Sequence, residues 1–95
     1  MKIPKSFKLG GVGYKVKMLK KLDEHDSLGL TLTDAGSVKI KRDQARDRLE
    51  HTMCHELFHC LFEAAGREDL SSDEGLVDVM ALLLHQYLES QKGEH

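Results

Sequence analysis

The segment with the clearest chemical potential contains His55, Glu56 and His59, which form a His-Glu-x-x-His pattern inside a stretch with helical apolar periodicity. Residues four apart lie on the same face of an α-helix, with Cβ atoms about 5–6 Å apart. Both imidazoles can therefore bind one Zn²⁺ ion, at Zn–N distances of roughly 2.0–2.1 Å. Glu56 follows the first histidine and can take a proton from a water molecule at the same position. The pattern predicts a zinc-assisted hydrolytic site.

A catalytic zinc ion needs a third protein ligand, so the sequence must supply another donor. Glu63 lies eight residues beyond His55, about 12 Å along a helix axis, and cannot share the metal. Glu74 lies in the first turn of a second predicted helix, and Asp78 follows one turn later on the same face. A short connection can bring two helices back into contact. We therefore expect Glu74 to bind zinc and Asp78 to accept a hydrogen bond from a ligating histidine.

Hydrolysis at a carbonyl carbon also needs a donor for the oxyanion that forms in the reaction. His85 is our candidate, because it lies eleven residues beyond Glu74 and close to the same helix face. Tyr14 and Tyr87 are less favoured, and Tyr87 is expected in the core. Ser71 and Glu74 also fit a capping box, which would use the same carboxylate, and this alternative stays open.

Two helices must position these side chains. The apolar stripe predicts a helix from Asp43, as its N-cap, to about Ala65, with Gly66 as the C′ residue. The second helix is predicted to run to about Ser90. Its N-cap is one of three residues, namely Ser71, Ser72 or Asp73. Because this helix is apolar nearly all round, we expect it to be covered by the first helix, by the sheet or by a second copy of the chain.

The residues before the first helix have the pattern of a small sheet. Gly10 and Gly11 suit a two-residue turn in a hairpin over residues 7–18. Further strands are predicted over residues 28–33 and 38–41. The alternating hairpin residues that are expected to share one face are Val12, Tyr14, Val16 and Met18. The prediction is an α+β fold, with a three- or four-stranded sheet packed on two helices.

Length and composition agree with one globular domain over residues 1–95, because 40% of the residues are hydrophobic and 32% are charged. Residues 1–22 hold seven lysines and no acidic residue. We interpret these lysines as the solvent-exposed face of a strand. Nucleic-acid binding is not expected, because no recognition motif accompanies them. Cys54 and Cys60 lie on different faces of one helix, which favours buried free thiols. No segment suits a signal peptide or a membrane span, so we expect a cytoplasmic protein.

The pattern His55-Glu56-x-x-His59 followed by Glu74-x-x-x-Asp78 resembles the gluzincin clan of zinc metallopeptidases. The strand-rich front and the leucine-rich stretch after Asp78 look most like the ImmA/IrrE group of bacterial and phage proteins, and the likeness covers roughly residues 38–84. The resemblance implies a minimal zincin-like domain in which His55, His59 and Glu74 bind Zn²⁺. It further implies that Glu56 is the general base and acid and that Asp78 orients His55.

The chain departs from this family in three respects. The connection between His59 and Glu74 is short, Val77 replaces a small residue, and no helix-turn-helix or sensor domain accompanies the core. We expect a peptidase whose extended peptide or protein substrate pairs with residues 38–41 as a sheet edge. A homodimer through the apolar second helix is a further expectation. The alternatives are a non-catalytic zinc-binding structural or interaction module and, more remotely, a nucleic-acid binder.

Overall fold

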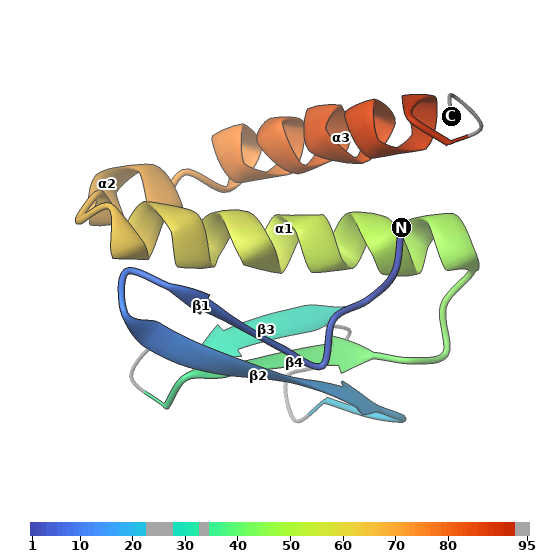
Figure 1. Cartoon of the computed structure of the whole chain (residues 1–95), viewed down its shortest axis with the longest axis horizontal. Coiled ribbons are helices and arrows are strands. Elements are labelled where there is room, and N and C mark those ends of the chain that lie inside the picture. The colour runs from blue at the N-terminus through green and yellow to red at the C-terminus, as the bar shows by residue number, and fades with distance from the viewer. Residues whose placement is uncertain (23–27, 33–34, 93–95) are drawn as a thin grey trace.

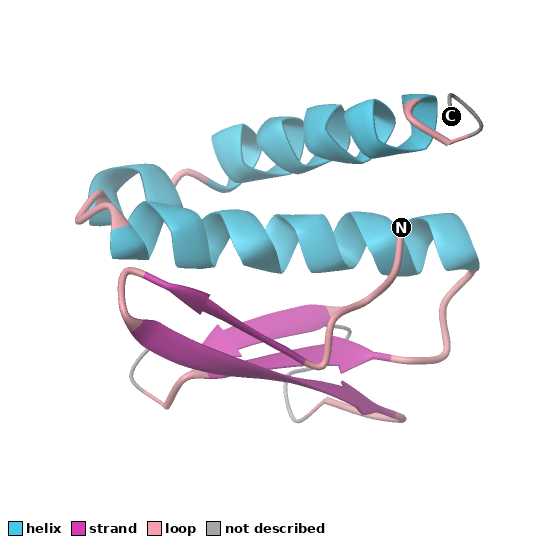
Figure 2. Ribbon diagram, viewed as in Figure 1, coloured by secondary structure: helices cyan, strands magenta, loops and turns pink. Residues whose placement is uncertain are grey.

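A sheet, helix α1 (Arg46–Ala64) and helix α3 (Glu74–Ser90) form three stacked layers, with α1 in the middle (Figure 1). The structure is a computed structural model, and it describes residues 1–22, 28–32 and 35–92. Strands come first in the chain and helices follow, and the helices lie on one face of the sheet (Figure 2). The predicted α+β class and the small sheet are confirmed. The sheet has four strands and mixed pairing, and a short helix joins the two long ones.

The sheet contains a hairpin and a second pair of strands beside it. The strands are β1 (Ser6–Leu9), β2 (Val12–Leu19), β3 (Gly29–Leu32) and β4 (Ser37–Lys41), in the order β1-β2-β4-β3. The hairpin turn has positive φ at Gly10 (57°) and Gly11 (79°), as the two glycines predict. β2 and β4 are parallel, whereas β3 and β4 are antiparallel. Residue 33 of the predicted strand over 28–33 lies outside the described residues.

The expectation that residues 38–41 form a sheet edge is wrong. They belong to β4, which pairs with β2 on one side and with β3 on the other. β3 is the strand that borders the sheet on this side, and it packs against α1. The parallel pairing of β2 with β4 moves β3 outward, and local alternation of side chains carries no signal for such a long-range pairing. Any strand addition near α1 must therefore use β3.

The two faces of the sheet differ in chemistry. Val38 and Ile40 of β4 are fully buried, and they face α1 together with Tyr14. Because side chains alternate along a strand, the register places Gly29 and Thr31 of β3 on that same face. The opposite face carries the lysines of β2 and β4. Val12, Tyr14, Val16 and Met18 alternate to one face of β2, as expected, but that face is only partly covered, since the exposed fractions of Val12 and Met18 are 45% and 38%.

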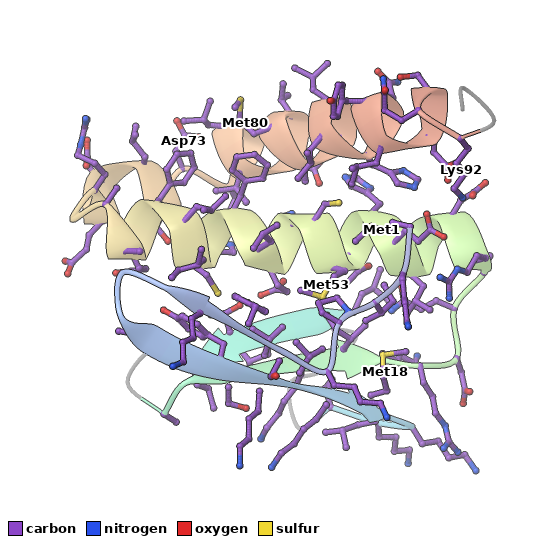
Figure 3. All side chains as sticks on the ribbon, viewed as in Figure 1. Met1, Met18, Met53, Asp73, Met80 and Lys92 are labelled. Atoms are coloured by element: carbon purple, nitrogen blue, oxygen red, sulfur yellow. The ribbon has the colours of Figure 1, made fainter. Side chains whose placement is uncertain are left out.

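Helix α1 (Arg46–Ala64) supplies the middle layer. Its core side chains include Leu49, Met53 and Cys60, and Met53 lies between α1 and the sheet (Figure 3). Asp43 does not cap this helix, because the N-cap position is Ala45 and no side chain makes a cap hydrogen bond.

A glycine ends α1 as predicted. Gly66 has φ of 72°, and its N–H donates to the Glu63 carbonyl, while the Arg67 N–H donates to the Phe62 carbonyl. These two hydrogen bonds form a Schellman motif, which satisfies the last carbonyls of the helix and turns the chain back.

Helices α2 (Glu68–Ser71) and α3 (Glu74–Ser90) follow this turn. Asp73 is the N-cap of α3, and its side chain accepts a hydrogen bond from the Leu76 N–H at 3.1 Å. α3 packs on α1, but its outer residues Val79, Leu83 and Tyr87 are all more than half exposed. The expectation that Tyr87 lies in the core is therefore wrong, and the homodimer through α3 stays a prediction. Within the part of the chain that the structure describes, every helix is too short or too polar to cross a membrane.

Candidate metal centre

His55, His59 and Glu74 lie together where the last turns of α1 meet the first turn of α3. The Nε2 atoms of His55 and His59 lie 3.1 Å from Oε2 and Oε1 of Glu74, respectively. The imidazole rings stand edge to face, with centroids 5.1 Å apart. One possible ligand atom from each residue lies within 4.8 Å of the others. The structure thus brings together the three residues that the sequence predicts as metal ligands.

The turn after α1 explains why Glu74 reaches the histidines. Gly66 reverses the chain, α2 makes a single helical turn, and the Asp73 cap fixes the start of α3. Glu74 is consequently the first residue of α3 and lies opposite the C-terminal half of α1. The fourteen residues between His59 and Glu74 are long enough to complete α1 and make this reversal.

Each histidine is held through its second ring nitrogen. Nδ1 of His55 lies 3.3 Å from Oδ1 of Asp78, and Nδ1 of His59 lies 3.0 Å from Oγ of Ser71. A neutral imidazole with its proton on Nδ1 donates to each partner and keeps the Nε2 lone pair for a metal. Ser71 is buried, and nothing in the sequence distinguishes this role from the cap that its position suggests.

The arrangement fits zinc. A tetrahedral ion with ligand distances of about 2.0–2.2 Å separates its ligand atoms by about 3.3–3.6 Å. The 3.1 Å contacts between Glu74 and the two Nε2 atoms are close to that separation. Two imidazole nitrogens and one carboxylate oxygen are also the donor set of several catalytic zinc sites, in which water takes the fourth position.

Glu56 belongs to the same region, but its carboxylate faces the sheet. Oε1 accepts a hydrogen bond from Oγ1 of Thr31 at 2.7 Å. Burial raises the pKa of Glu56, and the hydrogen bond from Thr31 and the nearby histidines only partly oppose this effect. A Cβ on Gly29 would lie 3.0 Å from Oε2 of Glu56 and 2.8 Å from Cγ2 of Thr52. Gly29 therefore leaves room for the Glu56 side chain, and sequence analysis identified neither Gly29 nor Thr31.

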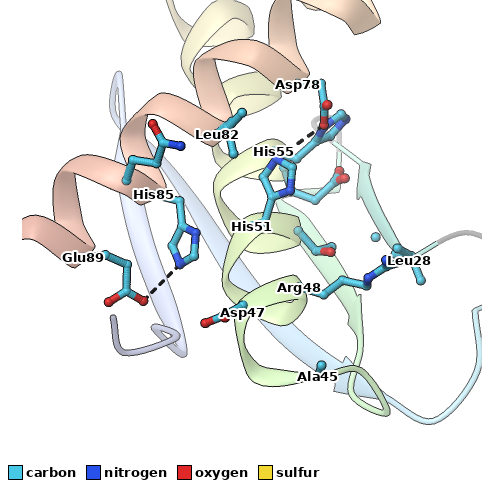
Figure 4. A pocket seen from close by; sticks show the side chains of 14 residues that line it. Leu28, Ala45, Asp47, Arg48, His51, His55, Asp78, Leu82, His85 and Glu89 are labelled. Carbon is cyan, nitrogen blue, oxygen red and sulfur yellow. Dashed lines mark hydrogen bonds and ion pairs between the residues drawn. The ribbon is translucent and has the colours of Figure 1, made fainter.

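Two clefts meet at His55 and Glu56. The larger, of about 1180 Å³, extends along α1 and α3 from Asp78 to Glu89 (Figure 4). The smaller, of about 440 Å³, lies between the β3 border and Glu74. Because both clefts reach the candidate metal ligands, a chain-like molecule can approach the site along either direction.

His85 does not join the metal group. Its Nε2 lies 2.9 Å from Oε1 of Glu50, whose exposed fraction is 2%. Burial alone would raise the pKa of Glu50, but hydrogen bonds from His85 and Arg46 hold that pKa well below its usual range. Eleven residues correspond to about 16 Å along a helix, so His85 faces the first turns of α1, although it lies on the same side of α3 as Glu74. The predicted role of His85 at the oxyanion finds no support in this geometry.

The other alternative donors and ligands lie elsewhere. Tyr14 is buried among the sheet and α1 residues, and Tyr87 is on the outer side of α3. Cys54 and Cys60 are buried free thiols, as expected, and burial raises the pKa of each to about 11. A thiol with such a pKa stays protonated near neutral pH and is a poor metal ligand.

No family model matches the chain, and neither a curated protein nor a solved structure matches it. The case for a function therefore rests on the arrangement of the side chains themselves. Those that meet at the site are His55, Glu56, His59, Glu74 and Asp78, with Thr31 and Ser71 beside them.

Proposed function

We propose that the protein is a zinc-dependent peptidase of the gluzincin type, in which His55, His59 and Glu74 hold the metal. One observation carries the proposal: a single carboxylate, that of Glu74, lies 3.1 Å from the Nε2 atom of each histidine. The Nδ1 atoms are engaged by Asp78 and Ser71. The two imidazoles thus present their Nε2 atoms to one carboxylate, which a pair of unrelated surface histidines has no reason to do.

The chemistry divides between the metal and Glu56. Zinc in such a site acts as a Lewis acid that acidifies water and polarises a carbonyl group. Glu56 removes a proton from the attacking water, whose oxygen forms a bond to the scissile carbonyl carbon. Glu56 then gives that proton to the amide nitrogen as the C–N bond breaks, so an amine and a carboxylic acid result. Asp78 and Ser71 hold the imidazoles in place throughout.

Thr31 and burial prepare Glu56 for this task. The Thr31 hydroxyl donates to Oε1 at 2.7 Å and fixes the carboxylate, while burial raises its pKa. A raised pKa makes the carboxylate a stronger base and a better proton carrier near neutral pH. The same hydrogen bond keeps a larger fraction of Glu56 ionised than burial alone would allow.

An extended peptide has a natural place beside β3. This strand pairs with β4 on one side only, and Leu30 and Thr31 line the smaller cleft together with His59 and Glu74. Unpaired N–H and C=O groups of a border strand can bind a peptide through main-chain hydrogen bonds. A peptide bound in this way passes the metal ligands and Glu56, so we assign β3 rather than β4 as the substrate strand.

The direct test compares wild type with Glu56→Gln after loading with zinc. Casein and a mixture of quenched fluorescent peptides serve as substrates, and bound zinc is measured by elemental analysis. We expect wild type to hydrolyse peptides and Glu56→Gln to lose about 10²–10⁴-fold in rate with its zinc retained, because general base catalysis contributes about this much. Glu68→Gln, an exposed carboxylate of α2, is the matched control.

Two results would reject the peptidase. The first is zinc-loaded wild type that hydrolyses no peptide in the mixture, and the second is full activity in Glu56→Gln. If chelation of zinc also unfolds the chain, the zinc ion has a structural role, as in the non-catalytic alternative.

A further inference from the structure

A second group of ligand-type side chains lies at the far end of the larger cleft. Asp47 is in the first turn of α1, while His85 and Glu89 are in the last two turns of α3 (Figure 4). One possible ligand atom from each of these residues lies within 4.8 Å of the others. α1 and α3 are antiparallel, so the start of one helix faces the end of the other. We propose that Asp47, His85 and Glu89 bind a second divalent transition-metal ion.

The histidine of this group is buried and held, as a metal ligand usually is. Nε2 of His85 lies 2.9 Å from Oε1 of Glu50 and 3.3 Å from Oε1 of Glu89. Oε2 of Glu50 accepts a hydrogen bond from Arg46 at 2.7 Å. Both carboxylates approach the same ring nitrogen, so an ion bound at Nε2 would have the Glu50 oxygen beside it as a further ligand atom. His55 differs in this respect, because Asp78 lies at its Nδ1 atom and Glu74 at its Nε2 atom.

The charges of the group favour a cation. Asp47 makes no ion pair among the described residues, and Glu89 uses Oε2 for Lys92 at 3.0 Å while its Oε1 faces His85. An imidazole nitrogen with two carboxylate oxygens suits Zn²⁺, Mn²⁺ or Fe²⁺ better than Ca²⁺ or Mg²⁺, which prefer oxygen ligands only. With one imidazole instead of two, we expect weaker binding of zinc than at His55, His59 and Glu74.

This ion would be separate from the first. Asp47 and His55 are eight residues apart on α1, about 12 Å along the axis. Paired catalytic metals lie only about 3.5–4 Å apart, so the two groups do not form one dinuclear centre. An ion bound by Asp47, His85 and Glu89 instead ties the N-terminal end of α1 to the C-terminal end of α3. Helix ends fray most easily, and this tie would hold both ends against each other.

The competing explanation needs no metal. His85 can be protonated, and its Nε2–H can then lie between the carboxylates of Glu50 and Glu89, which satisfies these three side chains and leaves out Asp47. The two explanations differ in the number of ions that the folded protein binds, and Asp47 has a role only in the first.

The test is equilibrium dialysis of the full chain against zinc, with bound metal measured by elemental analysis and the fold followed by circular dichroism. We expect two zinc ions per wild-type chain and one in the double variant Asp47→Asn/Glu89→Gln. That variant changes only side chains near the surface, and its remaining ion reports that it is folded. Glu68→Gln/Asp69→Asn, which changes two exposed carboxylates of α2, is the control and should keep both ions. In Glu74→Ala, one ion should remain.

Three results would overturn the second site. The first is that wild type binds no zinc. The second is that wild type binds one ion, which Glu74→Ala loses and the double variant keeps, and the third is that the double variant still binds two ions. The second of these leaves the proposed peptidase standing. The reverse pattern, with one ion lost in the double variant and kept in Glu74→Ala, supports the second site and rejects the first.

Discussion

Two histidine–carboxylate groups lie at opposite ends of the contact between α1 and α3, and they are built in similar ways. In the first, Asp78 of α3 faces the ring of His55 of α1; in the second, Glu50 of α1 faces the ring of His85 of α3. The surroundings differ. The Asp78 side chain is 60% exposed, whereas that of Glu50 is 2% exposed and also bound by Arg46.

This difference shows how one local arrangement can serve two purposes. The first group has a second imidazole, that of His59, and beside it the carboxylate that we propose as the base, Glu56, where two clefts meet. The second group has no second imidazole and no proposed base, and the Glu50 carboxylate beside His85 is buried. An accessible end suits a reaction, while an end built around a buried and paired carboxylate suits the fixing of two helices. The predictions below test this division.

The largest effect is expected from Glu50→Ala, which should reduce the free energy of unfolding by about 3–5 kcal/mol. Removing one member of a buried charged pair leaves its partners without a counter-charge. Urea unfolding of the variant, beside Glu68→Ala as an exposed control, measures this loss. A cost similar to that of the control would mean that Glu50 does not fix the two helices.

The stability that Glu50 supplies should depend on pH. Its pKa is lower in the folded protein than its ordinary value of 4.5, so its contribution is complete above about pH 4.5 and is lost as the pH falls further. Glu50→Gln should therefore flatten the acid limb of a plot of stability against pH. An unchanged acid limb would contradict the assigned ion pairs.

Glu74→Ala should weaken zinc binding at the first group by at least about 100-fold, because removal of a ligand costs more than the 10–100-fold that outer contacts cost. Competition with a chromophoric chelator measures the affinity. Asp73→Ala is a useful comparison, since it removes the cap beside Glu74 and leaves the ligand in place. Equal losses in the two variants would indicate that Glu74 acts through the fold alone.

Asp78→Asn and Ser71→Ala should each weaken zinc binding by about 10–100-fold, since these residues orient His55 and His59. Ser71→Thr keeps a hydroxyl group at this position, so its zinc affinity should be closer to that of wild type than the affinity of Ser71→Ala. Binding that is unchanged in both Asp78→Asn and Ser71→Ala would show that the imidazoles are oriented by helix packing alone.

The smallest effect is expected from Thr31→Val, which should lower kcat about tenfold without loss of zinc. The hydrogen bond to Glu56 is worth about 1.5 kcal/mol, and each 1.36 kcal/mol corresponds to a tenfold change in rate. Thr31→Ser keeps the hydroxyl and should restore most of the activity. A defect that is equal in both variants would point to packing instead of positioning of the base.

The sequence could predict the first group because its signals are local. Helical periodicity places His55 and His59 together, and a glycine followed by a capped helix brings Glu74 and Asp78 back to them. The position of Thr31 and the pairing of Glu50 with His85 could not be predicted in the same way. They depend on the parallel contact of β2 with β4 and on the antiparallel packing of α3, which local spacing does not record. For the same reason, helical spacing predicts that His85 shares a side of α3 with Glu74 but does not indicate that it lies beside Glu50.

The central claim concerns one ion bound by two histidines of α1 and a carboxylate of α3. Anomalous diffraction at the zinc edge, from crystals grown with zinc, tests this claim most directly. We predict a strong peak about 2.0–2.2 Å from His55 Nε2, His59 Nε2 and a Glu74 carboxylate oxygen. Ordered histidines with no peak between them, at a zinc concentration that occupies other sites, would contradict the claim.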